Sequence, residues 1–486
     1  MSLALEDKDP PYKALKLLEI GRGILANLQL ETRSDISVLK AQHPELARRF
    51  EELRNHIDSP STSSAMNEDR TSGVNVLPSI TIKSQQSLVN QFDHLLSEIR
   101  SLPGFENFLN GPSETQMRSL ATKGPIVVFN VSKIRSDAFL ITVDQIRSVH
   151  LPLLTTESVT HFGSLLWESI FEDATSLRRY PQGITKMNAV LQGLWDCGVK
   201  QVLEELGFTQ MSVSGQPWPR VWWVASGLLS LLPIHAAGYH GSQNPSETVL
   251  DRVVSSYAFS VKTLTYAAEK ASKSHRGEQL EAILIGMPTT PDQRNLPSVT
   301  KEITDIQSAL TRSSIPVLVE TDAPTRAYAL SKLPNYGIVH FACHGISAQD
   351  PSQSRLLLQD WQTTPLTVSD LSSLVIESAN FAYLSTCHSS AMRNLRLLDE
   401  SINLSSAIQL CGYPSVVGSL WQLEASHSAE VAKSVYEWIL GDNPGFDASR
   451  SSEGLHSAVR QLRDRTRSGR KNDDPLVWAP FIHVGL

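Results

Sequence analysis

Cysteine is scarce in this sequence. Its 486 residues include four cysteines: Cys197, Cys343, Cys387 and Cys411. Four thiols at these irregular spacings exclude the disulfide framework of a small secreted protein, and they include no CxxC pair of the kind that binds metal. Reduced thiols in an intracellular compartment are the simplest interpretation. We therefore expect a cytoplasmic protein.

The sequence also lacks a large excess of one charge and an uninterrupted apolar run long enough to span a membrane. The 43 Lys and Arg against 50 Asp and Glu give a formal net charge of -7. Mixed signs give no reason to expect nucleic acid or an anionic membrane as a partner. Residues 1–13 lack the basic start and apolar core of a signal peptide. The longest apolar run, residues 221–238, contains serine, proline and histidine, so we interpret it as a buried strand followed by a loop.

The first part of the chain has a helical pattern. Apolar residues recur at three-, four- and seven-residue steps over 12–56, which predicts two antiparallel helices with a turn near 33–35. A third helix is expected over 84–101. Between them lies a stretch rich in Ser, Thr and charge, and we expect a disordered loop near 59–80. We assign residues 1–118 to a helical N-terminal segment.

From residue 119 onward, strand and helix patterns alternate. The runs PIVVFNV (125–131) and AFLITV (138–143) predict a hairpin. The charged stretch EKASKSHRGEQ (269–279) is interpreted as a connector between two α/β units, 119–273 and 274–486. Near-continuous apolar strands separated by helices predict a mostly parallel sheet covered by helices on both faces.

The second unit has the clearest pattern. Buried strands are expected at AILIGM (282–287), GIVHFA (337–342), NFAYLS (380–385) and SVVGSLW (415–421). After the first of these, Ser298 is the expected cap of a helix. The unit is therefore predicted to form a parallel sheet whose strand ends meet at one edge.

Two titratable residues follow such strand ends: His344 comes after GIVHFA, and Cys387 comes after NFAYLS. In an open parallel sheet, ligands bind outside the carboxyl ends of the strands. A thiol and an imidazole facing one crevice make the pair that a cysteine nucleophile needs, since the thiolate attacks and the imidazole accepts its proton. The amides of Gly345 and of Cys387 itself are candidate donors to an oxyanion.

Structural roles explain the neighbouring residues. His340 lies inside the strand and is interpreted as a core histidine. Cys343 and Cys411 are interpreted as small buried apolar residues. His388 competes with His344 as the base, although adjacent residues on one turn rarely point at each other. Spacing alone leaves catalysis and a structural role open for the His344 and Cys387 pair as well.

Beyond the pair, the motifs HFACHG (340–345), LSTC (384–387) and GYPSVVGSLW (412–421), with RLLLQD and LTVSDL between the first two, resemble those of the CHAT peptidases. These are caspase-like cysteine proteases related to separase and often attached to tetratricopeptide repeats. The resemblance extends over roughly 120–486. It implies that His344 is the general base, that Cys387 is the nucleophile, and that neither a metal nor an organic cofactor is needed.

The resemblance also implies an architecture in which a pseudo-caspase-like unit, 119–273, precedes an active caspase-like unit, 274–486. His235 in LLPIHAAG would then have a structural role. The N-terminal helices look like the segment that links repeats to the CHAT region, and they are candidate sites for a regulatory protein partner. The expected substrate is a protein, and neither nucleic acid nor a membrane is expected as a partner.

Two departures from the family pattern affect function. Cys387 is followed by HSSAM, without the glycine that commonly follows the nucleophile. In related proteases an acid shortly after the "LW" pair helps to form a pocket for a basic side chain. Here the first acid is Glu424, with Asp399 and Glu400 as further candidates, so cleavage after Lys or Arg is a hypothesis.

The leading hypothesis is thus a cytoplasmic cysteine endopeptidase with a Cys-His dyad. The alternative is a catalytically silent caspase-like scaffold that mediates protein-protein interactions. A third hypothesis is a cysteine hydrolase that acts on a bond other than the peptide bond.

Overall fold

The protein divides by its internal contacts into two units, residues 1–27 with 112–486, and residues 28–111. The boundaries at 118/119 and 273/274 that the sequence suggests stay predictions. The computed structural model describes residues 2–6, 10–21, 39–40, 42–58, 91–92, 94–103, 105, 108, 111–172, 180–212, 217–242, 244–274, 280–348, 350–386, 403–422, 424–441, 445–468 and 474–486.

The smaller unit is helical, as predicted. Helix α5 (Pro44–Asp58) belongs to it, and residues 94–100 are helical within the predicted third helix. The predicted turn near 33–35 and the predicted loop near 59–80 lie outside the described residues. An apolar cluster holds the unit together through side chains from both helices and from the segments before and after them, namely Leu39, Ala47, Phe50, Leu95, Ile99, Phe105 and Phe108.

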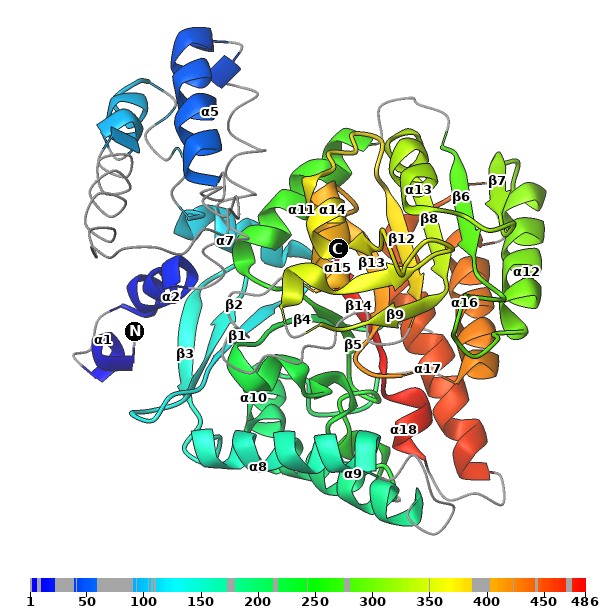
Figure 1. Cartoon of the computed structure of the whole chain (residues 1–486). Helices are drawn as coiled ribbons and strands as arrows, with labels where there is room; N and C mark the ends of the chain where they lie inside the picture. Colours follow the sequence, from blue (N-terminus) through cyan, green and yellow to red (C-terminus); the bar gives the residue numbers. More distant parts are fainter. Residues whose placement is uncertain are drawn as a thin grey trace, which may run out of the picture. The chain divides into compact units, whose positions relative to one another are not determined.

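The larger unit is built on an 11-stranded sheet with the order β3-β2-β1-β4-β5-β14-β13-β12-β8-β6-β7 (Figure 1). A second sheet of three strands has the order β11-β10-β9. The strands are β1 (Ile126–Asn130), β2 (Asp137–Ile141), β3 (Ile146–His150), β4 (Arg220–Val224), β5 (Val254–Tyr257), β6 (Ala282–Gly286), β7 (Val317–Glu320), β8 (Ile338–Ala342), β9 (His344–Ile346), β10 (Arg355–Leu357), β11 (Leu366–Thr367), β12 (Phe381–Ser385), β13 (Ser415–Ser419) and β14 (Phe481–Gly485).

Apart from β2, which pairs antiparallel with both β1 and β3, the large sheet consists of two halves that run in opposite directions. Strands β1, β4, β5 and β14 are parallel to one another, and so are β13, β12, β8, β6 and β7. The halves meet where β14 pairs antiparallel with β13. The strands of the two halves therefore end at opposite edges of the sheet, and the predicted α/β fold with a mostly parallel sheet is confirmed.

Helices connect and cover the strands. They are α1 (Ser2–Glu6), α2 (Pro11–Gly21), α7 (Glu114–Leu120), α8 (Thr156–Trp167), α9 (Tyr180–Leu194), α10 (Lys200–Glu205), α11 (Val261–Ser274), α12 (Ser298–Arg312), α13 (Arg326–Lys332), α14 (Val368–Ser373), α15 (Leu404–Cys411), α16 (Ala425–Leu440), α17 (Ser451–Ser468) and α18 (Pro475–Trp478). In the second half, α12, α16 and α17 pack side by side on one face, and α14 and α15 pack together on the other (Figure 1).

The predicted cap of α12 is wrong. The helix begins at Ser298 itself, and the capping position is taken by Pro297 without a side-chain cap hydrogen bond. The φ of Pro297 is -63°, which already suits a helix, so the helical backbone starts one residue earlier than a serine cap would require.

Residues 221–238 form a strand followed by irregular chain, as predicted. Strand β4 is followed by two short 3₁₀ helices, η4 (Gly227–Leu231) and η5 (Ile234–Ala236). Over the described ranges, no helix has both the length and the apolar composition that a bilayer crossing needs.

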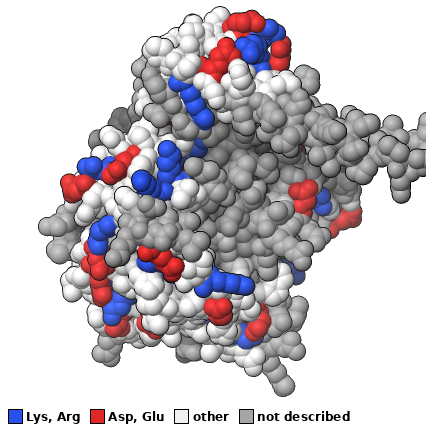
Figure 2. Space-filling view, turned by 90° about the vertical axis from the view of Figure 1, so that its left-hand side faces the viewer, with Lys and Arg blue, Asp and Glu red and all other residues white. Residues whose placement is uncertain are grey.

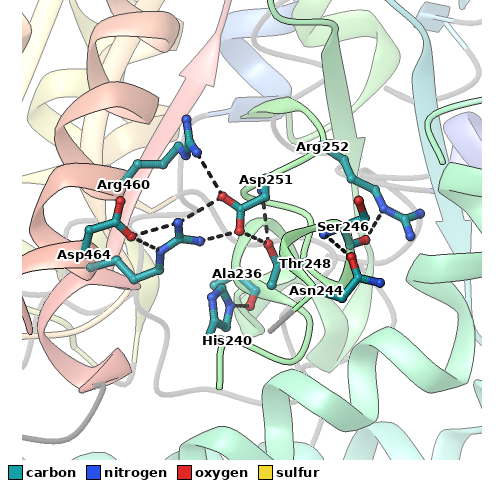
Figure 3. A network of polar contacts seen from close by, with 10 residues as sticks. Ala236, His240, Asn244, Ser246, Thr248, Asp251, Arg252, Arg460 and Asp464 are labelled. Atoms are coloured by element: carbon teal, nitrogen blue, oxygen red, sulfur yellow. Dashed lines mark hydrogen bonds and ion pairs between the residues drawn. The ribbon is translucent and has the colours of Figure 1, made fainter. Parts of the chain in front are cut away.

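A buried ionic network links the loop before β5 to helix α17 (Figure 3). Asp251 accepts two hydrogen bonds from the Arg463 guanidinium, at 2.7 and 2.9 Å, and both residues are almost fully buried. Arg460 approaches the same carboxylate at 3.1 Å, and the Thr248 hydroxyl donates to it at 2.7 Å. Since Asp251 lies before the connector near residue 273 and Arg463 after it, this network fastens the two stretches of the α/β chain to each other.

Candidate active site

The candidate site lies at the ends of β8 and β12, which are neighbours in the sheet. Their parallel register places Ser385 opposite Ala342, the last residue of β8. In the sequence, His344 follows Ala342 by two positions and Cys387 follows Ser385 by two positions. Cys387 lies outside the described residues. The expectation that the two strands are adjacent and end at the same edge is confirmed.

His344 begins β9 and is partly exposed. Its Nε2 lies 2.7 Å from the backbone oxygen of Arg294. Because a carbonyl oxygen can only accept, Nε2 must donate its proton, which leaves the lone pair of Nδ1 to act as the base in the neutral ring. Sequence reasoning missed Arg294, since a backbone carbonyl has no signature in the side-chain pattern.

The loop that carries Arg294 is fixed to the end of β8 and to the segment after β10. The Met287 amide donates to the Ala342 oxygen at 2.8 Å. The Trp361 indole N–H donates to the Pro291 oxygen at 3.0 Å, and Gln362 contacts Asp292. These bonds hold the carbonyl of Arg294 in place, and with it the orientation of the His344 ring.

The end of β12 is held from two sides. The hydroxyls of Ser385 and Ser428, the latter on α16, lie 2.7 Å apart. The Ser419 hydroxyl, at the end of β13, donates to the Thr386 backbone oxygen at 2.9 Å. Thr386 and Ser419 are both buried. The chain is thus positioned up to the residue before Cys387.

The other predicted site residues are distributed as follows. Gly345 lies in β9 opposite Leu356 of β10. Glu424 takes the capping position of α16, with 67% of its side chain exposed. It lies 3.3 Å from Nδ1 of His427 and accepts a hydrogen bond from Ser426 at 3.1 Å. Asp399, Glu400 and His388 lie outside the described residues.

The residues expected to be structural are structural. His340 is fully buried, stacks on Tyr383 and lies 3.2 Å from the Glu302 carboxylate. Cys343 and Cys411 are 1% exposed, as small core residues should be. His235 is buried, with Nδ1 2.8 Å from the Tyr257 hydroxyl. It follows β4, whose carboxyl end is at the opposite edge of the sheet from that of β8.

His235, His456 and His483 line one small cavity between β5, β14 and α17. Burial lowers the pKa of His235 and that of His456 to about 3, and the pKa of His483 well below its usual range. These rings are neutral in the folded protein at neutral pH, whereas a histidine of the unfolded chain gains a proton near pH 6.5.

We therefore expect the free energy of unfolding to fall as the pH drops from 6.5 toward 3, because over that range the unfolded chain binds more protons. The loss is at most about 1.4 kcal/mol per pH unit and histidine. Urea denaturation at pH 7.5 and 5.5 measures it. The exposed His161→Gln is the control and should keep the same pH dependence. Equal midpoints at the two pH values would contradict the expectation.

On the face in Figure 2, Lys and Arg side chains lie beside Asp and Glu over much of the described surface, rather than gathering by sign. Among the described residues, no group of three or more His, Cys, Asp or Glu side chains is arranged to hold a metal ion. The described part of the site thus contains a histidine with a fixed tautomer just after the end of β8, beside the strand that leads to Cys387.

Several solved structures are similar to this chain. The structure of the separase-securin complex of Saccharomyces cerevisiae matches with a TM-score of 0.52 and 12% identity, over 84% of this chain and 34% of that chain. A second structure of the same complex matches with a TM-score of 0.49 and 10% identity, over 84% of this chain and 34% of that chain. The structure of gingipain R, an Arg-specific cysteine proteinase, matches with a TM-score of 0.38 and 11% identity, over 68% of this chain and 74% of that chain. No curated protein matches.

The separase likeness shows the fold, and this chain spans about a third of the separase chain that it matches. The family is shown by sequence. The family model described as the CHAT domain matches residues 188–486, which contain His344, Cys387 and all strands from β4 onward. Since this match extends over more than half of the chain, the protein belongs to the CHAT domain family.

Proposed function

We propose that the protein is a cysteine endopeptidase that hydrolyses peptide bonds of protein substrates through His344 and Cys387. The observation that carries this proposal is the register of β8 and β12, whose ends lie side by side and lead to the two residues at equal distances along the chain. The CHAT family and the separase-like fold support the same chemistry.

In the proposed reaction, Nδ1 of His344 takes the proton of the Cys387 thiol, and the thiolate attacks the carbonyl carbon of the peptide bond. The hydrogen bond from Nε2 to the Arg294 oxygen keeps the ring in the tautomer that this step requires and stabilises the imidazolium that forms. The amides of Gly345 and Cys387 bind the oxyanion of the tetrahedral intermediate.

Collapse of the intermediate breaks the C–N bond, and His344 returns its proton to the leaving amine. The acyl group is then held on Cys387 as a thioester. His344 next takes a proton from water, the hydroxide adds to the thioester carbonyl, and the carboxylic acid leaves as the thiol is restored. Every proton is accounted for by His344 and water.

The direct test is labelling with an electrophilic peptide probe, with the modified residue read by mass spectrometry. Labelling at Cys387 that is lost in Cys387→Ala and in His344→Ala supports the dyad. Cys343→Ala is a matched control, because Cys343 is adjacent in sequence to His344 but buried, and it should label like wild type. Cuts in protein substrates distinguish an endopeptidase from a hydrolase of another bond.

Absence of labelling in wild type would favour the scaffold alternative. One observation keeps that alternative in view: HSSAM follows Cys387, so the family's usual glycine is missing from the nucleophile loop. A scaffold would bind its partner equally well in wild type and in Cys387→Ala.

We further propose cleavage after a basic residue, recognised by Glu424. Glu424 occupies the capping position of α16, and Ser428 of that helix contacts the strand leading to Cys387. Glu424→Gln should lower kcat/KM for an arginine peptide about tenfold, the effect of one charged hydrogen bond, and leave a leucine peptide unchanged. Glu430→Gln, an exposed acid further along α16, is the control. A wild-type preference for Asp or Leu peptides would contradict this pocket.

We also propose that another protein regulates the activity of this peptidase. The yeast separase that this fold resembles was crystallised with securin. We place a regulatory protein partner on the N-terminal helices of this chain and the enzyme in the cytoplasm, where its thiol stays reduced.

A further inference from the structure

The end of β13 makes a hydrogen bond to the chain just before Cys387. The Ser419 hydroxyl is completely buried and lies 2.9 Å from the backbone oxygen of Thr386, which is 2% exposed. Since a carbonyl oxygen can only accept, the hydroxyl donates. With water excluded, such a bond is stronger than the same bond at the surface. The carbonyl of Thr386 is therefore held in the direction of β13.

The direction of this carbonyl determines the direction of the next amide. A trans peptide group is planar and carries its C=O and its N–H on opposite sides. Strand β12 lies between β13 and β8 in the sheet. A Thr386 oxygen that points toward β13 thus leaves the opposite side of its peptide group on the β8 side. His344 and Gly345 follow β8 on that side.

A second contact restrains the preceding residue. The Ser385 hydroxyl lies 2.7 Å from the hydroxyl of Ser428, which is buried on α16. The chain is therefore anchored on α16 at residue 385 and on β13 at residue 386. An oxyanion donor that is fixed before the reaction needs no reorganisation when the negative charge develops. Such a donor therefore lowers the activation free energy more than a mobile one does.

We propose that Ser419 is a positioning residue of the oxyanion hole. Its hydroxyl orients the Thr386–Cys387 peptide so that the Cys387 amide and the Gly345 amide point at the same oxyanion. Ser419 itself touches no substrate. This inference rests on the proposed peptidase function and assigns a residue to it that the His and Cys motifs do not contain.

The test compares two reactions of Cys387 in wild type, Ser419→Ala and Ser419→Thr. Peptide hydrolysis and binding of a peptide aldehyde both create a tetrahedral oxygen that needs the oxyanion hole, whereas alkylation by iodoacetamide creates none. Ser419→Ala should lower kcat about 10- to 100-fold and weaken aldehyde binding by a similar factor. KM and the alkylation rate should stay within about twofold of wild type. Ser419→Thr, which keeps the hydroxyl, should restore kcat.

Ser415→Ala is the matched control. Ser415 is a buried serine of the same strand, but its hydroxyl bonds to Ser451 and His483 instead. This variant should lose stability in thermal unfolding and keep its kcat. An unchanged kcat in Ser419→Ala, an equal loss in Ser415→Ala, or a parallel loss of alkylation would overturn the inference and leave the peptidase proposal standing. A wild type that neither hydrolyses peptides nor labels at Cys387 would overturn the peptidase proposal and the inference together.

Discussion

Cys387→Ala should lower kcat for a peptide substrate by about 10⁴-fold or more, because the variant lacks the sulfur that forms the acyl-enzyme. His344→Ala should lose a similar factor, since a nucleophile and its base act as a unit and the losses do not add. Steady-state hydrolysis of a fluorogenic peptide measures both variants and the double variant. The double variant should be no slower than the slower single one.

Two controls separate loss of chemistry from loss of fold. The thermal unfolding midpoint should be close to wild type in both variants, because His344 is partly exposed and the proposed role of Cys387 is chemical. Cys343→Ala removes a buried thiol beside His344 and should keep kcat within about tenfold of wild type, with some loss of stability. A Cys387→Ala protein that keeps more than a tenth of wild-type kcat would rule out this nucleophile.

The largest loss of stability is expected at the ionic network between the loop before β5 and α17. Asp251→Ala leaves the Arg463 guanidinium buried without its bidentate partner, and we expect the free energy of unfolding to fall by about 3–5 kcal/mol. Chemical denaturation followed by circular dichroism measures the change. Asp251→Ala combined with Arg463→Met should recover part of it, because the second substitution removes the unpaired charge.

An exposed ion pair provides the comparison. Lys301 and Asp305 lie 2.6 Å apart on α12, at positions i and i+4, and the lysine side chain is 74% exposed. Asp305→Ala should have little effect on the free energy of unfolding, because solvent screens an exposed pair. If Asp251→Ala and Asp305→Ala had equal effects, the buried network would contribute nothing beyond a surface pair.

Much of the second half of the sheet could be predicted because its strands are buried on both faces. Strand β6 is a continuous apolar run, and β8 is one apart from His340, and such runs stand out in the sequence whatever lies next to them in space. His344 was recognised for the same reason, since the end of a clear strand marks its position.

Other features depend on contacts between distant segments and were missed. Strand β3 lies at the edge of the sheet and has the consecutive polar residues Arg147 and Ser148 at its centre, so it produces no apolar run. Strand β14 is a short run whose place in the middle of the sheet is set by pairing with β13. The contacts of His344 with the Arg294 oxygen and of Ser419 with the Thr386 oxygen involve main-chain atoms, which every residue has.

The central position of β14 has a consequence for synthesis of the protein. Residues 481–485 leave the ribosome after every other strand of the sheet, yet they separate β5 from β13 and connect the two halves. The Trp222 indole in β4 also donates a hydrogen bond to the Gly485 oxygen at 2.7 Å. A nascent chain that still lacks this strand leaves β5 and β13 as open edges, so the two halves of the sheet can join only after residues 481–485 have been synthesised.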